Sequence, residues 1–340
     1  MSGAATVGLG RGALTRRLLA AFTAVMVSLG LASCSTLDRL PPVPLSLASD
    51  IVPLSVPFAR FYADGDQAQV EAFARELAEK ALAAEKRHPQ PPNKPNIFLA
   101  MSGGGDDGAF GAGLLLGWTA RGDRPSFRIV TGTSTGALSA PFAFLGSEYD
   151  PQLKAVYTET AAKDIFSAKP VLAAVAGDSL ADTKPLRNLI SRYLDKTMIR
   201  RIAEEYDKGR FLLISTTNLD QSRAVIWNIG AIAKSPDPRA RDLIIEVLRA
   251  SASIPGAFPP VMLDVTVDGK RYEEMHVDGG TVAQAFLYPP QINLKKESAR
   301  YGLARKSVAY IIRNGRLFRP EEQVKRNSLA IAGKAISTMT

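Results

Sequence analysis

One serine lies in a setting that suits nucleophilic chemistry. Residues Gly132 to Gly136 read G-x-S-x-G with Ser134 at the centre, between a β-branched run and a small, apolar helical run. This is the context of a nucleophile elbow, a sharp strand-to-helix turn that exposes the serine hydroxyl. Gly132 and Gly136 leave room for the turn, and the N-terminus of the following helix favours a forming alkoxide. Ser134 is therefore the candidate nucleophile, and a glycine-rich turn without chemistry is the alternative.

A serine hydroxyl needs a base, and the chain has only two histidines, His88 and His276. His88 lies in a proline-rich stretch, and no histidine follows His276 to serve the order Ser, acid, His of an α/β-hydrolase. Asp278 is the better candidate because it ends a predicted strand and precedes Gly279 and Gly280, which leave its carboxylate uncrowded. A turn aspartate and a Ser–His–Asp arrangement through His276 are the alternatives. If the serine and aspartate act without a histidine, acyl transfer should not require the ionisation of a group with a pKa of ~6.5, the ordinary value for histidine.

A glycine-rich loop precedes the serine. The stretch SGGGDDGAFGAG contains a formal match to G-x-G-x-x-G at Gly103, Gly105 and Gly108. This pattern is typical of dinucleotide sites, but the second strand ends without an acidic ribose partner, and Asp106 and Asp107 would repel a pyrophosphate. The alternative is an oxyanion hole, because glycines let backbone N–H groups approach a developing negative charge closely. A third role for these glycines, close packing of a helix on the sheet, is compatible with either kind of site.

The elements around these motifs alternate between strand and helix. NIFLAMS and FRIVT read as strands, and GAFGAGLLLGWTA and GALSAPFAFLG read as the helices that follow them. This order predicts an α/β fold with a mainly parallel sheet covered on both faces. Further on we expect a strand pair in RFLLISTTNL and RAVIWNIG, a helix in ARDLIIEVLRASAS, a hairpin in VMLDVTVDGKRYEEMHV and a late buried strand in SVAYIIRN. Upstream, Val70, Phe73, Leu77 and Ala81 have the spacing of an amphipathic helix.

The first residues have the pattern of an export signal. Three arginines precede an apolar run from Leu18 to Ala32, which is shorter than a typical transmembrane span. LASC, ending at Cys34, resembles the lipobox of bacterial lipoproteins, which implies cleavage before Cys34 and lipidation of its thiol. Two or three acyl chains anchor a protein stably to a membrane. Ser35 after the cysteine then implies the periplasmic face of the outer membrane, and a plain secretory signal is the alternative.

Composition limits the classes of function. Hydrophobic residues make up 46% and charged residues 22%, which is ordinary for a folded, water-soluble domain. The formal charge is +9, but the basic residues are scattered without interleaved aromatics, so we expect no nucleic-acid partner. Three of these charges lie in the leader, and the remaining 9 − 3 = +6 suits an anionic membrane surface. Cys34 is the only cysteine, which excludes an intrachain disulfide and a cysteine-based metal site.

The motifs GGGDDG, GTSTG and DGG occur in that order, and together they resemble the patatin-like phospholipase family. DTKPLRNLI and RASASIPGAFPPV are similar to the family as well, and the likeness covers about residues 96–314. The resemblance implies a three-layer α/β/α sandwich with a mainly parallel central sheet. It also implies hydrolysis of acyl esters of phospholipids or other lipids, without a metal or another cofactor.

The resemblance also implies roles for individual residues. Ser134 would be the nucleophile and Asp278 the base that takes its proton directly. Backbone N–H groups of four glycines would form the oxyanion hole: Gly103, Gly104, Gly105 and Gly108. Asp107 departs from the family, which usually has Arg or Lys at this place. A negative charge there would oppose an oxyanion.

Four segments are expected along the chain. Residues 1–33 form the signal peptide, residues 34–65 a proline-rich tether after the lipidated cysteine, residues 66–95 an amphipathic helix with a linker, and residues 96–340 the acyl hydrolase domain. The last residues look helical without a stop signal, which is compatible with a native domain that continues further. The competing hypothesis is a catalytically weak or silent lipoprotein of the same fold that binds lipid or an envelope partner.

Overall fold

The computed structural model describes residues 37–65, 67–91, 93–170, 173, 177–288, 292–303, 305–316, 323–326 and 334. The predicted signal peptide and Cys34 lie outside the described residues, as does nearly all of the final helical segment. Residues 40–340 form one compact unit, and residues 1–39 are assigned to another. Among the helices that the structure describes, none has the length and hydropathy needed to cross a bilayer.

An eight-stranded mixed sheet organises the unit that begins at residue 40, with the main strand order β1–β7–β6–β3–β2–β10. The strands are β1 (Arg60–Tyr62), β2 (Asn96–Met101), β3 (Ile129–Thr133), β6 (Phe211–Asn218), β7 (Arg223–Asn228), β8 (Val261–Val267), β9 (Lys270–Asp278) and β10 (Ser307–Ile312). The four strands β10, β2, β3 and β6 run parallel, whereas β7, β1, β9 and β8 extend the sheet by antiparallel pairing. The strands alternate with helices as expected from the sequence.

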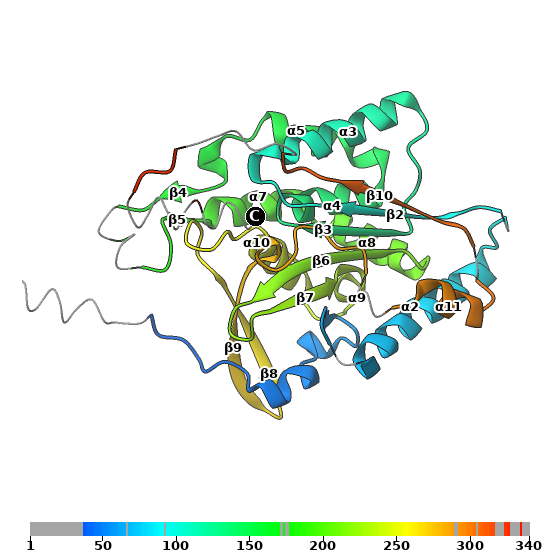
Figure 1. Ribbon diagram of the computed structural model, residues 1–340, viewed down its shortest axis with the longest axis horizontal. Coiled ribbons are helices and arrows are strands. Elements are labelled where there is room, and N and C mark those ends of the chain that lie inside the picture. Colours follow the sequence, from blue (N-terminus) through cyan, green and yellow to red (C-terminus); the bar gives the residue numbers. More distant parts are fainter. Residues whose placement is uncertain are drawn as a thin grey trace, which may run out of the picture. The chain divides into compact units, whose positions relative to one another are not determined.

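Side chains of the central strands alternate between two apolar layers. Leu99, Val130 and Leu212 belong to a core with α4 (Thr135–Leu145) and α10 (Ala240–Ser251). Their neighbours Phe98, Ile129 and Phe211 belong to a second core with α2 (Gln67–Arg87). Successive residues of a strand point to opposite faces, so each central strand is buried on both sides. The predicted α/β/α sandwich is therefore confirmed, and Figure 1 shows α2 below the sheet and α3 and α5 above it.

The remaining helices complete the two outer layers. The layer that contains α4 and α10 also holds α3 (Gly108–Arg121), α5 (Asp150–Thr158), α7 (Lys184–Tyr193), α8 (Lys196–Asp207) and α9 (Ile229–Ala233). A short helix, α11 (Leu294–Arg300), contacts α2, and a separate two-stranded sheet joins β4 (Ser167–Ala168) to β5 (Ala181–Asp182). Local signals set some helix ends, since Asp195 caps α8 through the N–H of Met198 and Gly122 ends α3 with φ +88°.

The segment before residue 96 differs from the expected tether and linker. Short 3-10 turns form at Leu45–Asp50 and Pro53–Ser55, and β1 then pairs with β7. The apolar stripe of α2 packs against the sheet, where the rings of Phe61 and Phe73 lie 4.0 Å apart between centroids. An amphipathic helix needs a partner for its apolar face, and the strands supply one. The boundary expected at residue 96 therefore falls inside a single compact unit.

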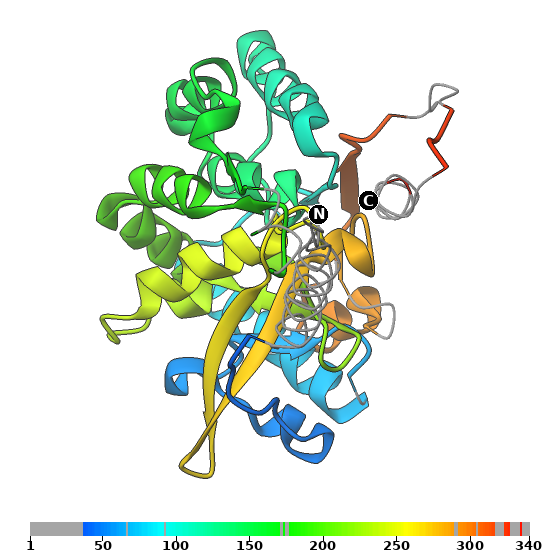
Figure 2. The same ribbon diagram turned by 90° about the vertical axis from the view of Figure 1, so that its left-hand side faces the viewer.

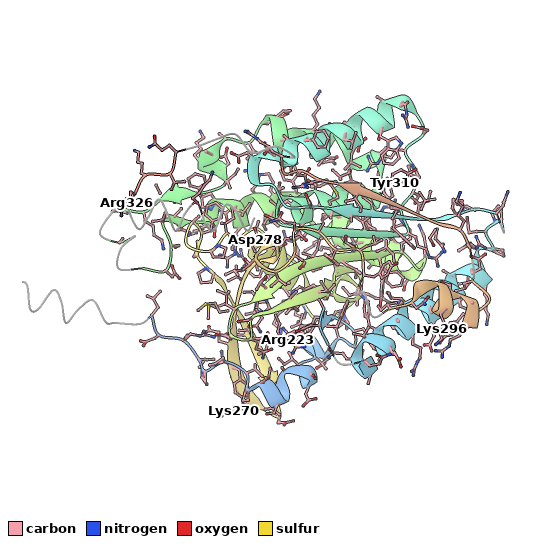
Figure 3. All side chains as sticks on the ribbon, viewed as in Figure 1. Arg223, Lys270, Asp278, Lys296, Tyr310 and Arg326 are labelled. Carbon is pink, nitrogen blue, oxygen red and sulfur yellow. The ribbon has the colours of Figure 1, made fainter. Side chains whose placement is uncertain are left out.

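The last strand is less enclosed than expected. SVAYIIRN was predicted to form a buried strand, and β10 does form there, but at the edge of the sheet with β2 as its partner. Tyr310 and Ile311 are 38% and 69% exposed, and Tyr310 is labelled near this edge in Figure 3. A hydrophobic run alone does not distinguish a central strand from an edge strand, and so this part of the prediction was wrong.

Candidate active site

Two strands end against the same edge of β6 and bring the predicted nucleophile and base together. β3 runs parallel to β6, and its last residue pairs with Ser215. β9 runs in the opposite direction along the same edge, and its last residue, Asp278, pairs with Thr216. The residue that follows β3 is Ser134. The C-terminal ends of β3 and β9 therefore meet beside two consecutive residues of β6, Ser215 and Thr216. Figure 3 shows Asp278 at this end of the central strands, and Figure 2 shows the β8–β9 hairpin (yellow) from which it comes.

Ser134 and Asp278 are joined by a direct hydrogen bond. The Ser134 hydroxyl Oγ donates to Asp278 Oδ2 at 2.6 Å, and the Gly280 N–H donates to the other carboxylate oxygen at 2.7 Å. Asp278 is completely buried and Ser134 is 7% exposed. Burial raises the pKa of Asp278 to about 6, against the opposing effect of the hydrogen bonds from Ser134 and Gly280. A carboxylate with this pKa can accept a proton reversibly near neutral pH.

The turn at Ser134 has the strained backbone of a nucleophile elbow. Its φ is +55° and its ψ is −127°, a conformation that costs a non-glycine residue about 1–3 kcal/mol. The Ser134 N–H donates to Ser251 Oγ at 3.0 Å, and the Ser251 hydroxyl donates to the Ser215 carbonyl at 2.7 Å. Ser251 thereby ties the strained turn to β6. No local sequence pattern singles out this serine, because its role depends on a contact between segments that are 117 positions apart.

The two glycines around Ser134 are required by close approaches of backbone. A Cβ atom at Gly132 would lie 2.7 Å from the Cα of Ala137, and one at Gly136 would lie 2.3 Å from the Met101 carbonyl oxygen. Both distances are well below van der Waals contact, and the atoms approached belong to the main chain, which cannot turn away as a side chain can. The G-x-S-x-G pattern thus reflects the tight packing of α4 on both β3 and β2.

Gly136→Ala is expected to lower the free energy of unfolding by about 1–3 kcal/mol, because the added methyl group must displace the Met101 backbone. Gly113→Ala is the matched control, since a Cβ at this position of α3 would meet nothing within 4 Å. Alanine is favoured over glycine in a helix by about 1 kcal/mol, so the control should gain stability. Urea unfolding of both variants checks the pair, and equal effects would contradict the packing argument.

The four glycines of the loop before α3 divide into two pairs. Gly103 donates its N–H to the Gln284 carbonyl at 3.0 Å, and a Cβ there would lie 3.1 Å from the Ser134 Cβ. The Gly108 N–H is bonded within its own turn, and a Cβ there would lie 2.1 Å from Thr135 Oγ1. Gly103 and Gly108 therefore allow close packing, and their N–H groups are already used by protein acceptors.

The other pair, Gly104 and Gly105, has backbone dihedrals that favour glycine, with φ +155° and +54°. Within the described parts of the chain, the N–H groups of these two residues donate to no protein acceptor. A Cβ at Gly104 would lie 2.8 Å from Asn314 Cβ, whereas one at Gly105 would meet nothing within 4 Å. Of the four glycines expected to form an oxyanion hole, this pair has N–H groups available.

Asn314 holds this loop in place and was not identified from the sequence. Its side-chain amide donates to the Ser102 carbonyl at 2.7 Å, and its side-chain oxygen accepts from the Gly111 N–H at 3.0 Å. Its own N–H donates to Ser102 Oγ at 2.9 Å. The sequence position of Asn314, two residues after a predicted strand, could have indicated that it lies near the glycine loop, because the C-terminal ends of parallel strands meet at one edge of the sheet.

Asp107, where the family usually has a basic residue, has a positively charged neighbour. Its Oδ2 lies 3.3 Å from the Nε of Arg316, and the side chains are 38% and 65% exposed. Solvent screens a pair at this level of exposure, so its contribution to stability is small. The arginine nevertheless places a positive charge beside the carboxylate that was expected to oppose an oxyanion.

His276 has partners other than the serine and the aspartate. Trp227 Nε1 donates to Thr216 Oγ1 at 2.8 Å, so the threonine hydroxyl can donate to His276 Nδ1 at 2.9 Å. The imidazole proton then lies on Nε2, 3.3 Å from a Glu274 oxygen. Burial lowers the pKa of His276, with Glu274 opposing, so the ring is neutral. Among the described contacts it has none with the catalytic candidates, and His88 is exposed at the end of α2.

A buried ion pair lies next to the histidine. Arg60 of β1 donates to both carboxylate oxygens of Glu274, and Asn218 Nδ2 donates to one of them at 3.0 Å. Burial alone would raise the pKa of Glu274, but the charge of Arg60 and the hydrogen bonds from His276 and Arg60 hold it well below its usual range. This network was not anticipated, and it fixes β9 at Glu274, four residues before Asp278 ends that strand.

The described residues contain no group of three or more His, Cys, Asp or Glu side chains that could hold a metal ion. Three kinds of group lie at the candidate site. They are one hydroxyl, one buried carboxylate and two unoccupied backbone N–H groups in the adjoining loop.

Comparison with known proteins adds two findings. The profile of the family described as Patatin-like phospholipase matches residues 99–288, and no curated protein sequence matches the chain. Among solved structures, the chain is similar to VipD from Legionella pneumophila, with 14% identity and a TM-score of 0.39. That match covers 72% of this chain and 53% of VipD, so the chain spans about half the length of that protein.

Proposed function

The chain belongs to the patatin-like phospholipase family, and we propose that it hydrolyses acyl esters of lipids with Ser134 as nucleophile and Asp278 as general base. Family membership supports lipid acyl hydrolysis in general. The finer assignment is supported chiefly by the 2.6 Å hydrogen bond from Ser134 Oγ to Asp278 Oδ2. This geometry lets the proton pass directly to the carboxylate without an intervening imidazole.

In the first half of the reaction, Ser134 Oγ attacks the ester carbonyl carbon while its proton moves to Asp278 Oδ2. The carbonyl π electrons move onto oxygen, and the N–H groups of Gly104 and Gly105 are the candidate donors to this oxyanion. When the tetrahedral intermediate collapses, the bond to the leaving alcohol breaks and Asp278 returns the proton to that oxygen. The acyl group is then bonded to Ser134 as an ester.

In the second half, Asp278 takes a proton from a water molecule as the water oxygen attacks the acyl-serine carbonyl. Collapse breaks the bond between the acyl carbon and Ser134 Oγ, and the proton returns to the serine. The products are a carboxylic acid and the free enzyme, with no net change in redox state and no required metal. Burial of Asp278 contributes to both halves, because a pKa of about 6 makes it a stronger base than an exposed aspartate.

The proposal is tested by p-nitrophenyl butyrate hydrolysis as a function of pH. The kcat/KM of the wild type is expected to increase with pH, reach half its maximum near pH 6 and level off above about pH 7, because Asp278 must be ionised to act as a base. Ser134→Ala should have only background activity. Burial of the aspartate therefore revises the expectation of no ionisation near 6.5, since an acid limb in this range does not require a histidine.

His276→Gln identifies the group that titrates. Its amide can retain the contacts to Thr216 and Glu274, and the acid limb should persist because the neutral imidazole of His276 is not the base. Loss of the limb in this variant would favour a Ser–His–Asp mechanism. Hydrolysis that is unchanged in Ser134→Ala would refute the proposal, whereas a wild type without activity above background would favour the alternative, a lipid-binding protein of this fold.

The proposal also includes a location. The lipobox-like sequence at Cys34 would give the mature chain a lipid anchor, and a signal of this kind with Ser35 would place the protein at the periplasmic face of the outer membrane. Phospholipid or other acyl-lipid substrates would then be available in the membrane to which the protein is attached. No nucleic-acid partner is part of the proposal.

A further inference from the structure

A cavity of about 70 Å³ lies at the opposite end of the parallel strands from Ser134. Its lining includes residues at the beginnings of β2, β3, β6 and β10, namely Asn96, Ile129, Phe211 and Ser307. Ile129, at the cavity, and Ser134 are five positions apart along β3 and its end, which corresponds to about 16 Å along a strand. The cavity is therefore separate from the proposed active site.

One wall of the cavity is apolar. Leu77 and Ala81 of α2 face Phe98, Ile129 and Phe211 of the sheet across it. All of these side chains except Ala81 belong to the second core, and the cavity lies between the helix and the strands. A ligand in this space would gain by removing apolar surface from water.

The polar side of the cavity carries excess positive charge. Arg128, Arg305 and Glu85 all line it. The Arg305 guanidinium donates to Glu85 Oε1 at 2.6 Å and to backbone carbonyls of residues 90 and 91. One carboxylate thus faces two arginines, and it is engaged by Arg305.

Arg128 is the group that lacks a partner. In the regions covered by the structure, its guanidinium makes no hydrogen bond or ion pair with a protein group. Burial lowers the pKa of Arg128, Glu85 opposes this effect, and Arg305 reinforces it. Arg128 is half-buried, and a half-buried guanidinium is less well hydrated than an exposed one, so an anion that binds there gives up less hydration of the protein than at an exposed arginine. The unpaired guanidinium therefore indicates a binding position for an anion.

We propose that this cavity binds a carboxylate with a short alkyl chain, with the carboxylate at Arg128 and the chain against Leu77, Phe98 and Ile129. A guanidinium matches the two oxygens of a carboxylate in a bidentate geometry. The volume is about half that of the roughly 150 Å³ cavity that holds benzene in an engineered protein, so the fitting chain is short. The inference does not depend on the proposed hydrolysis.

The test is calorimetric titration of the Ser134→Ala protein with propionate, which measures binding in the absence of turnover. We expect one propionate per chain, and about ten-fold or greater weakening in the additional variant Arg128→Met, because the charged hydrogen bonds are lost. Arg75→Met is the matched control, since Arg75 is an exposed arginine of α2 outside the cavity, and it should bind propionate as well as the parent. Arg128→Lys should recover part of the affinity.

Two further ligands test the two halves of the proposed site. Propionamide has the chain without the charge, and inorganic phosphate has charge without a chain, so both should bind about ten-fold or more weakly than propionate. Phosphate binding tighter than propionate, propionate binding that is unchanged in Arg128→Met, or no propionate binding would each overturn the proposal. Melting curves without ligand establish that Arg128→Met is folded, and a propionate-dependent increase in Tm should occur in Arg75→Met but not in Arg128→Met.

Discussion

Asp278→Asn is expected to reduce kcat/KM for ester hydrolysis by about 10²–10⁴-fold and, at pH 8, to raise the free energy of unfolding by about 3 kcal/mol. The loss of activity follows because an amide cannot take the proton from Ser134 Oγ, which now lies 2.6 Å from Asp278 Oδ2. The gain in stability follows because the wild type holds a carboxylate without a cationic partner in a fully buried position.

The sign and pH range of the stability effect follow from the pKa of Asp278. Burial raises it from 3.8 to about 6 on folding, so folding disfavours the ionised form. The cost of the charge is fully present above pH 6 and disappears as the pH falls below 3.8. Each pKa unit corresponds to about 1.4 kcal/mol, which gives the expected gain for the asparagine variant at pH 8. The gain should shrink steadily between pH 6 and pH 4.

Urea unfolding at pH 8 and at pH 4 measures this effect. Asp268→Asn is a matched control, because Asp268 occupies the exposed turn between β8 and β9, where asparagine also tolerates the positive φ. The control should change stability by less than about 0.5 kcal/mol and leave activity intact. If Asp278→Asn were less stable than the wild type at pH 8, the buried charge of Asp278 would not destabilise the folded protein as inferred from the structure.

Glu274→Gln is expected to lower the free energy of unfolding by about 3–5 kcal/mol, because it leaves the buried Arg60 guanidinium without a counter-charge. The side chains of Arg60 and Glu274 are 2% and 1% exposed, and Asn218 and His276 also bond to this carboxylate. The expected cost is therefore that of an uncompensated charge, not that of a lost surface contact.

A double variant separates these two contributions. Arg60→Met combined with Glu274→Gln removes both charges, so it should be more stable than Glu274→Gln alone. Asp123→Asn provides a surface comparison, since the pair of Arg121 with Asp123 is 71% and 58% exposed and should contribute about 1 kcal/mol or less. Urea unfolding of the four proteins completes the comparison. A Glu274→Gln cost no larger than that of Asp123→Asn would contradict the structural role of the buried pair.

The parts of the site that depend on local geometry could be predicted from the sequence. Gly132 and Gly136 are required by backbone contacts within one strand-turn-helix unit, so a short pattern around Ser134 was enough to indicate an elbow. Asp278 was singled out by the glycines that follow it, and Gly279 and Gly280 indeed stay close to Ser215 and to the Asp278 carboxylate. The alternation of strands and helices similarly fixed the fold class.

The parts that depend on distant segments could not be predicted in the same way. Arg60 and Glu274 are 214 positions apart, and no local pattern links an arginine in a short edge strand to a glutamate in a hairpin. The different roles of the four glycines depend on Gln284, which follows β9, and on Asn314, which follows β10, and both are distant from the loop in sequence. The tether expected before residue 66 failed because the prolines forbid helix but do not prevent a short strand from pairing with β7.

The rate of covalent labelling measures whether Asp278 activates Ser134 by taking its proton. A fluorophosphonate probe should modify the wild type at Ser134 at pH 8, as located by peptide mass spectrometry, and Asp268→Asn should react at the same rate. Asp278→Asn should react about 100-fold or more slowly while remaining folded. Labelling of Ser134 at the wild-type rate in Asp278→Asn would show that the carboxylate does not activate the serine.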